Sequence, residues 1–172
     1  VVADWDINEM TRYYTRTLDN GEKVIIDFNI TGGSSVSRKV DSLETVHDTS
    51  RTFNGEVIEA YYHFDNDGQM EHVLHYKTVH DSVETDDNDI TYSKKTTVTR
   101  KILAKGTWNF LKGIDDYKNK ERISLVIESY NEDLTVNILE NQVDDQGISL
   151  AGYPQNTTTR RNVEYKYANG DL

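Results

Sequence analysis

The stretch that decides the fold is residues 90–110, which read ITYSKKTTVTRKILAKGTWNF. Alternate residues from Ile90 to Phe110 form a set that can line a buried or half-buried face if Lys94 and Arg100 lay their stems along it. Most residues between them are polar. A period of two is that of an extended strand, because successive side chains point to opposite faces of a sheet. The stretch therefore predicts a β protein whose strands each have one wet face and one dry face.

As one straight strand, this stretch would measure roughly 70 Å at ~3.3 Å per residue. We expect it to bend or break at Gly106, where the missing side chain permits a kink or bulge. Such bends let sheets curl into barrels and orthogonal sandwiches. With turn signals every ten residues or so, the sequence predicts an all-β, mainly antiparallel fold. We expect a barrel or two-sheet sandwich of about ten to twelve strands, with little helix, in a single domain covering residues 1–172.

The clearest hairpin signal is Asp-Asn-Asp-Gly at residues 65–68. A three-residue loop whose glycine is left-handed would place Phe64 opposite Met70 on the apolar face and His63 opposite Glu71 on the polar face. A one-residue slip would destroy both patterns, because it moves every side chain to the other face. The two patterns together therefore predict one specific register.

Other local signals predict further turns. Asn20-Gly21 suits a two-residue hairpin turn, which would place Tyr13 opposite Phe28. The polar run at 130–133 predicts a four-residue loop between two strands. The main helical candidate is residues 4–12, with one or two turns expected there.

Composition limits the partners. The 172 residues include 30 acidic and 19 basic ones, a net charge of -11, and 11 tyrosines against four phenylalanines. An acidic surface repels phosphate backbones and anionic lipid, so we expect no nucleic-acid partner. A local basic patch would be an exception, and the candidates are residues 94–95 with 100–101, or 160–161. No apolar run is long enough for a membrane-spanning helix.

Catalytic and metal-binding signals are weak. The chain has no cysteine, which excludes disulfides, thiolate catalysis and cysteine-bound zinc. The five histidines do not converge on one point in the expected register. Clustered aspartates at 86, 87 and 89 and at 144–145 are compatible with calcium binding but are more typical of solvated loops. No nucleophile elbow, phosphate loop or dinucleotide motif is present. We therefore assign no catalytic residue, metal or cofactor, and expect a protein that is not an enzyme.

Aromatic residues offer the better functional lead. Exposed flat rings stack on sugars or partner proteins, and tyrosine is favoured at interfaces. The alternative is that tyrosine replaces aliphatic residues in a shallow core. The candidate ligand-binding residues are Trp108, Phe110, Tyr62, Tyr76 and Tyr92.

Two segments resemble known families. Gly106-Thr107-Trp108 resembles the Gly-x-Trp motif of the lipocalin-like (calycin) barrels, in which the glycine bends the first strand and the tryptophan plugs the barrel base. Residues 106–111 and 117–123 look like segments of exported β-rich lipoproteins of Bacteroidetes-type bacteria. The second resemblance implies an extracellular, cell-surface or periplasmic setting in a bacterium.

The function expected from these observations is non-catalytic. We predict an exported β domain that binds a protein, a small molecule or a glycan, as an accessory surface lipoprotein that is lipid-anchored rather than membrane-spanning. One alternative is a lipocalin-like carrier of a small apolar ligand, which requires a cavity of roughly 300 Å³ or more lined by Trp108 and Phe110. Another is a hydrolase whose site the sequence does not identify.

Overall fold

The computed structural model describes residues 3–17, 21–43, 50–86, 88–111, 122–144, 146, 148–150 and 155–166. Within these ranges it contains nine β-strands and no helix. The strands are β1 (Ala3–Asp6), β2 (Met10–Thr17), β3 (Lys23–Thr31), β4 (Ser35–Ser42), β5 (Ser50–Phe64), β6 (Gln69–Thr85), β7 (Thr91–Leu111), β8 (Arg122–Val143) and β9 (Gln155–Lys166).

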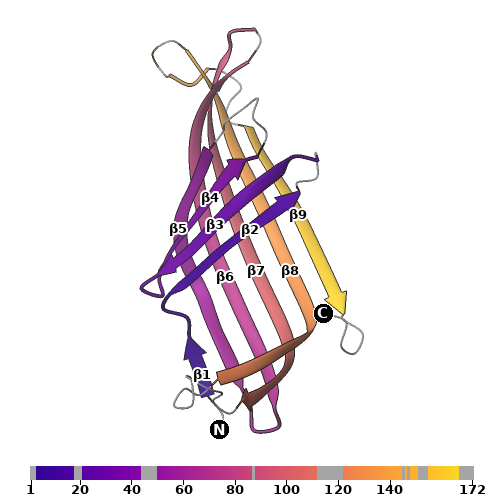
Figure 1. Ribbon diagram of the computed structural model, residues 1–172. Helices are drawn as coiled ribbons and strands as arrows, with labels where there is room; N and C mark the ends of the chain where they lie inside the picture. The colour runs from indigo at the N-terminus through magenta and orange to yellow at the C-terminus, as the bar shows by residue number, and fades with distance from the viewer. Residues whose placement is uncertain are drawn as a thin grey trace.

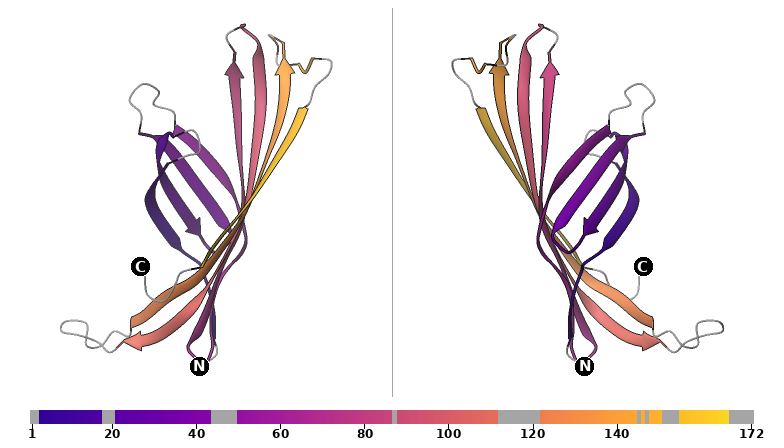
Figure 2. Two further views of the ribbon diagram at one scale, coloured as in Figure 1. Left: turned by 90° about the vertical axis from the view of Figure 1, so that its right-hand side faces the viewer. Right: turned by 90° about the vertical axis from the view of Figure 1, so that its left-hand side faces the viewer.

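The strands form one antiparallel sheet in sequential order from β2 to β9. The first strand, β1, pairs with the end of β5 that β4 leaves uncovered. The sheet curls on itself, so that β2, β3 and β4 lie across β6, β7 and β8 (Figure 1). Seen from the side, β2–β4 form one arm of the sheet and β6–β9 form the other, and the two arms diverge toward one end (Figure 2).

The all-β, antiparallel prediction is confirmed, and the closure is less complete than expected. The described residues form a curled half-barrel with β2 and β9 as its two edges, instead of a closed barrel or two separate sheets. They contain nine strands where we expected ten to twelve, because several strands are longer than predicted. Strand β8, for example, continues through the polar run at 130–133. In the described part of the chain, no helix has the length and apolar character needed to cross a membrane.

The hairpin at residues 65–68 has the predicted register. Phe64 pairs with Met70 and His63 with Glu71, and Gly68 has a φ of 78°. Asp65 organises the loop, since its Oδ1 accepts the backbone N–H groups two and four residues later, at 3.0 and 2.8 Å. Such Asx interactions are a local alternative to strand pairing, which is why aspartate is favoured in turns.

The first hairpin departs from prediction by one residue. Tyr14, and not Tyr13, pairs with a residue of the buried β3 face, Ile26. The error came from assuming a two-residue loop at Asn20-Gly21. The observed pairing of Thr17 with Lys23 makes the connection longer and reverses which face of β2 is inward. Tyr13 is consequently 71% exposed.

The predicted loop at 130–133 is also wrong, because this run lies in the middle of β8. Its polar side chains are satisfied across strands instead of by a turn. Asn162 on β9 donates hydrogen bonds to Asn131 and Asp133 on the outer face. Glu132 points to the inner face, where it pairs with Arg100 on β7. The residues 4–12 are likewise not helical, since they contribute to β1 and β2.

The core lies where the curled sheet meets itself. Alternate residues of β3 are almost completely buried, and they pack against the inner faces of β6 and β7. The rings of Phe28 and Tyr76 meet across this junction with centroids 5.1 Å apart. The buried cluster comprises Ile7, Val24, Ile26, Phe28, Ile30, Val36, Leu74, Tyr76 and Ile102. This contact fixes the relative position of the two arms that border the site described below.

The long strand β7 bends as expected but does not break. Opposite Lys105 and Gly106, β8 carries one extra residue, Glu128, which makes a β-bulge. Beyond it, the ends of β7 and β8 turn away from the rest of the sheet (Figure 2). A bulge raises local twist and bends the strand, which accounts for this turn.

Candidate functional site

Two adjoining cavities lie between the arms of the sheet. The first has a volume of about 250 Å³ and the second about 200 Å³, and Tyr76 and Arg100 border both. The first is lined by Arg12, Tyr14, Phe28, Leu74, Tyr76, Arg100, Ile102 and Tyr130. The second is lined by Arg16, Arg38, Tyr76, Val98, Arg100, Glu132, Leu134, Val136 and Arg161. We call the two together the arginine cleft.

The distribution of charge in the arginine cleft is opposite to that of the chain. Five of the eight arginines in the sequence line it, together with none of the lysines and one of the 30 acidic residues. The chain as a whole carries a net charge of -11. If charged residues were distributed at random over this acidic protein, acidic side chains would outnumber arginines in the cleft. The excess of arginine is therefore a specific feature of the site.

The pairing register places these arginines. Arg12 and Arg16 alternate along β2 with Tyr14 between them, opposite buried residues of β3. Side chains directly opposite in an antiparallel pair share a face, so all three point into the cleft. Arg38 on β4 lies opposite Phe28 of β3 in the same way. From the other arm, Arg100 and Arg161 come from β7 and β9 and both pair with Leu134 of β8.

Arg100 has an internal counterion. Its Nη2 donates to Glu132 Oε2 at 2.7 Å, and the Tyr130 hydroxyl donates to the same oxygen at 2.8 Å. Burial alone would raise the pKa of Glu132, but the hydrogen bond and charge of Arg100 outweigh it and hold that pKa below its usual range. Burial and Glu132 together raise the pKa of Tyr130. At neutral pH the cluster is therefore a guanidinium–carboxylate pair with a neutral phenol.

Arg38 has no such counterion among the described residues. Its guanidinium lies 5.5 Å from the centroid of the Phe53 ring, and its Nε atom is buried without a hydrogen-bond partner. Burial lowers the pKa of Arg38, and the charges of Arg100 and Arg16 add to this effect. Arginine remains protonated even so, because a guanidinium group is not deprotonated in proteins. A buried cation without an acid is costly, and an anion brought into the cleft would relieve that cost.

Arg12 is held by a neutral histidine. Its Nη2 lies 3.4 Å from His72 Nε2, while His72 Nδ1 lies 3.3 Å from the Tyr61 carbonyl oxygen. The consistent assignment is that Nδ1 carries the proton and donates to Tyr61, and Nε2 accepts from Arg12. Burial lowers the pKa of His72, which favours this neutral form. His72 therefore contacts Arg12, a lining residue of the first cavity, as a neutral acceptor.

Of the sequence-predicted ligand residues, Tyr76 lines both cavities and Tyr62 lies close by. Tyr76 is 1% exposed, and its hydroxyl accepts a long hydrogen bond of 3.5 Å from Arg100. Tyr62 packs against the core and stacks on His72 at a centroid distance of 4.3 Å. Tyr76 thus lines the arginine cleft, and Tyr62 packs behind it on His72, which contacts Arg12.

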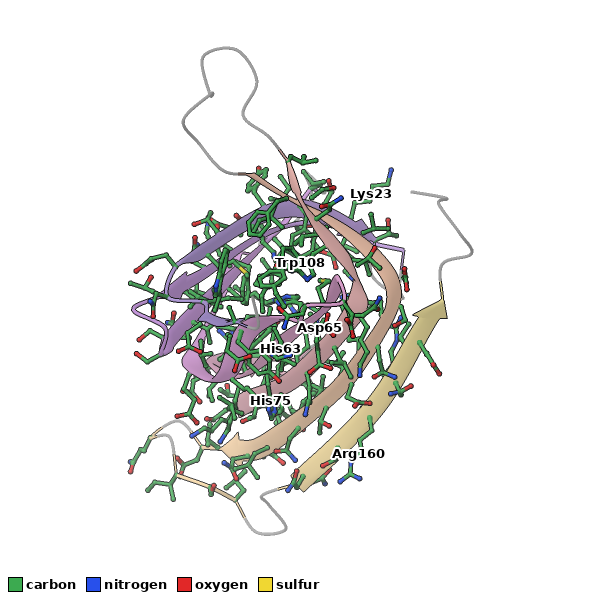
Figure 3. All side chains as sticks on the ribbon, turned by 90° about the horizontal axis from the view of Figure 1, so that it is seen from below. Lys23, His63, Asp65, His75, Trp108 and Arg160 are labelled. Atoms are coloured by element: carbon green, nitrogen blue, oxygen red, sulfur yellow. The ribbon has the colours of Figure 1, made fainter. Side chains whose placement is uncertain are left out.

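The other three predicted residues lie elsewhere. Trp108 and Phe110 lie at one end of the sheet, where their rings contact each other. The Nε1–H group of Trp108 donates a hydrogen bond to the carbonyl oxygen of Asp65 at 3.1 Å (Figure 3). Tyr92 lies at the opposite end of β7, and its hydroxyl donates to Asp86 at 3.3 Å. Trp108, Phe110 and Tyr92 do not line either cavity of the arginine cleft.

The aspartate-rich loops are organised by their own backbones. Asp86 Oδ1 accepts from the N–H groups of Asn88 and Ile90, both at 2.9 Å. Asp144 Oδ1 makes the same two contacts with Gln146 and Ile148. Within the described residues, no three His, Asp or Glu side chains come together as a metal ion would require. In these loops, Asp86 and Asp144 therefore serve to form the turns.

A separate acidic hollow lies on the outer face, lined by Asp4, Asp6, Tyr61, His63 and Glu71. His63 lies opposite Glu71 in the strand register, as predicted, but its side chain contacts Asp4 on β1 instead, with His63 Nδ1 2.5 Å from Asp4 Oδ1. Glu71 instead pairs with Lys105 at 3.0 Å. The hydrogen bond from Asp4 raises the pKa of His63. This contact joins β1 to β5 and depends on the protonation of His63.

We expect the Asp4→Asn substitution to lower the pKa of His63 toward its ordinary value of 6.5. The raised pKa means that the contact stabilises the fold below that ordinary value and is lost as pH rises through the folded-state pKa. NMR titration of the His63 ring resonances measures the shift, with Asp6→Asn as the matched control. An unchanged His63 pKa in the Asp4→Asn variant would contradict the assigned contact.

Sequence reasoning missed Arg12, Arg16, Arg38 and Arg161 as site residues, although it singled out Arg100 and the 160–161 pair as basic candidates. The available signal was the alternation of Arg12, Tyr14 and Arg16 opposite the apolar run of β3, which the one-residue register error concealed.

Comparison with protein-family models, curated proteins and solved structures finds no match for this chain.

Proposed function

We propose that this chain is a non-catalytic binding domain whose arginine cleft takes a small ligand bearing an anionic group. The observation that carries the proposal is Arg38, a cation with a buried, unpartnered Nε and no counterion among the described residues. Hydrogen bonds from a guanidinium to an anionic group are charge-assisted and about twice as strong as neutral ones. Such a ligand would satisfy donors that the fold itself leaves open.

The lining supports binding over catalysis. Glu132 is the one carboxylate among the lining residues, and Arg100 and Tyr130 already engage it. A general base must be free to reach the proton that it removes. The other polar lining groups are guanidiniums and phenols, which hold and orient an anion.

The test is titration calorimetry with benzoate, 2-naphthoate, octanoate and phenyl phosphate, each against its uncharged alcohol. We expect at least one anion to bind, and Arg38→Gln to weaken it roughly tenfold or more, the value of about 1.5–3 kcal/mol for a hydrogen bond to a charged group. The matched control is Arg160→Gln, which removes the same charge from an exposed arginine on the edge strand β9 that does not line the cleft (Figure 3).

Binding that is equal in wild type and Arg38→Gln would overturn this proposal, and so would the absence of binding by every anion in the set. An Arg160→Gln variant that loses as much affinity as Arg38→Gln would show only a general effect of charge. Circular dichroism of each variant confirms that the sheet is intact before affinities are compared.

We also propose that the domain is exported and acts as an accessory lipoprotein at a bacterial surface. The resemblance of residues 106–111 and 117–123 to exported lipoprotein segments supports it. Fractionation of cells expressing the natural gene tests it, with recovery in the periplasmic or membrane fraction expected. Recovery in the cytoplasmic fraction alone would contradict export.

A further inference from the structure

We propose that the ligand of the arginine cleft is an aromatic acid, with its ring in the first cavity and its single carboxylate or phosphate group in the second. This inference rests on the proposed function and specifies its ligand class. Three observations carry it: the sizes of the two cavities, the different residues that line them, and the position of the open guanidinium groups.

The sizes indicate one ligand that spans both cavities. Volumes of about 250 and 200 Å³ are each below the range of ~300–1,000 Å³ typical of small-molecule sites, and together they fall within it. Tyr76 and Arg100 border both spaces, so a ligand crossing from one to the other would contact both side chains. The site is suited to one or two rings and a head group.

The first cavity is lined mainly by aromatic and aliphatic groups. Tyr14, Phe28, Tyr76 and Tyr130 contribute four rings, and Leu74 and Ile102 contribute the aliphatic part of the lining. Phe28, Tyr76, Leu74 and Ile102 are each less than 5% exposed, so these walls are held in place by the core. Aromatic rings prefer offset or edge-to-face contact with other rings, at ~4.5–7 Å between centroids. Rigid ring walls therefore favour a planar, rigid body over a flexible chain, which would lose more rotational freedom on binding.

The second cavity supplies the charge. Four arginines and one carboxylate line it, and the carboxylate of Glu132 is already shared between Arg100 and Tyr130. The Nε atoms of both Arg38 and Arg100 are buried without a partner. A guanidinium presents Nε–H and Nη–H groups as a planar fork that matches carboxylate and phosphate oxygens. An anionic head group in this cavity would meet open donors from both arms of the sheet.

The experiment compares ligands that differ in one part at a time. The aromatic acids are 2-naphthoate and 2-naphthyl phosphate, which separate the two head groups. Octanoate keeps the charge without a ring, 2-naphthol keeps the ring without the full charge, and acetate and inorganic phosphate have no apolar body. Calorimetry with the wild-type chain should show one of the aromatic acids binding at least tenfold more tightly than all four of the others.

Two variants locate the ring. Tyr14→Leu removes an aromatic wall of the first cavity, and we expect it to weaken the aromatic acid by roughly three- to tenfold, the worth of an aromatic pair. Tyr13→Leu is the matched control, because Tyr13 is the adjacent residue on the opposite, exposed face. We expect it to leave the affinity unchanged.

Failure of this inference differs from failure of the proposed function. Octanoate binding as tightly as the aromatic acids, with the affinity still dependent on Arg38, would overturn the aromatic assignment and leave the anion site standing. Equal losses in Tyr14→Leu and Tyr13→Leu would also overturn it. If no acid binds, or if 2-naphthol binds as tightly as every acid in the set, both proposals fail.

Discussion

Replacing Glu132 by glutamine is expected to lower the free energy of unfolding by roughly 3–5 kcal/mol, the usual cost of breaking a buried ion pair by removing one partner. Glu132 is 8% exposed, and its partner Arg100 has a side chain only 13% exposed. The neutral variant leaves the largely buried Arg100 charge without its carboxylate, beside the other guanidinium groups that line the second cavity. The largest part of the loss comes from this uncompensated charge, since glutamine keeps nearly the same shape.

Urea denaturation measures this loss, and Glu140→Gln is the matched control. Glu140 lies 3.4 Å from Lys94 on a more exposed part of the sheet, with side chains 30% and 27% exposed. Exposed pairs contribute about 0–1 kcal/mol, so this variant should unfold close to the wild type. Similar unfolding midpoints for the Glu132→Gln variant and the wild type would contradict the buried pair.

The same substitution predicts a dependence on pH. The pKa of Glu132 is held below its ordinary value of 4.5, so its contribution to stability is present above that value. The contribution is lost as pH falls through the lower, folded-state pKa, because the protonated acid no longer pairs with Arg100. The stability difference between wild type and Glu132→Gln should therefore be constant near neutral pH and narrow in acid.

The parts of the fold that could be predicted are those where two independent signals coincide. At residues 65–68, the turn residues and the alternation of the flanking strands specify the same register, and the hairpin follows it. At Asn20-Gly21, the turn signal stood alone, because each face of β2 contains one tyrosine among mainly polar residues. Nothing in the alternation of β2 opposed a one-residue slip, and the slip reversed its inner face.

The arginine cleft could not be predicted because its chemistry depends on contacts distant in sequence. Glu132 reads as part of a turn until Arg100, 32 residues earlier, is known to face it. Arg38 reads as an ordinary surface cation until β4 is known to pair with the buried strand β3. Local pattern predicts strands and their faces, whereas the curl that brings β2–β4 over β6–β8 comes from apolar packing between strands far apart in the chain.

Substituting Gly106 by alanine is the second change with a large expected effect, a loss of about 3 kcal/mol in unfolding free energy, at the upper end for overpacking. A Cβ at this position would lie 1.8 Å from the carbonyl oxygen of Val126 and 3.0 Å from the Cα of Ile127. Both atoms belong to the backbone of β8, so no side-chain rotation can relieve the clash. The two strands would have to separate at the bulge that bends them.

Tryptophan fluorescence provides a local measurement beside the unfolding curve. In a Trp5→Phe background, Trp108 is the sole tryptophan, and its ring lies 5.4 Å from that of Phe64 just beyond the bulge. We expect Gly106→Ala to shift the Trp108 emission to longer wavelength and to lower the midpoint of thermal unfolding by about 10 °C, at ~2–4 °C per kcal/mol for a chain of this size. Lys105→Ala, on the exposed side of the same strand, is the matched control. If Gly106→Ala kept both the wild-type midpoint and the wild-type emission, β8 would not approach β7 closely here. The bend would then need a cause other than the missing side chain.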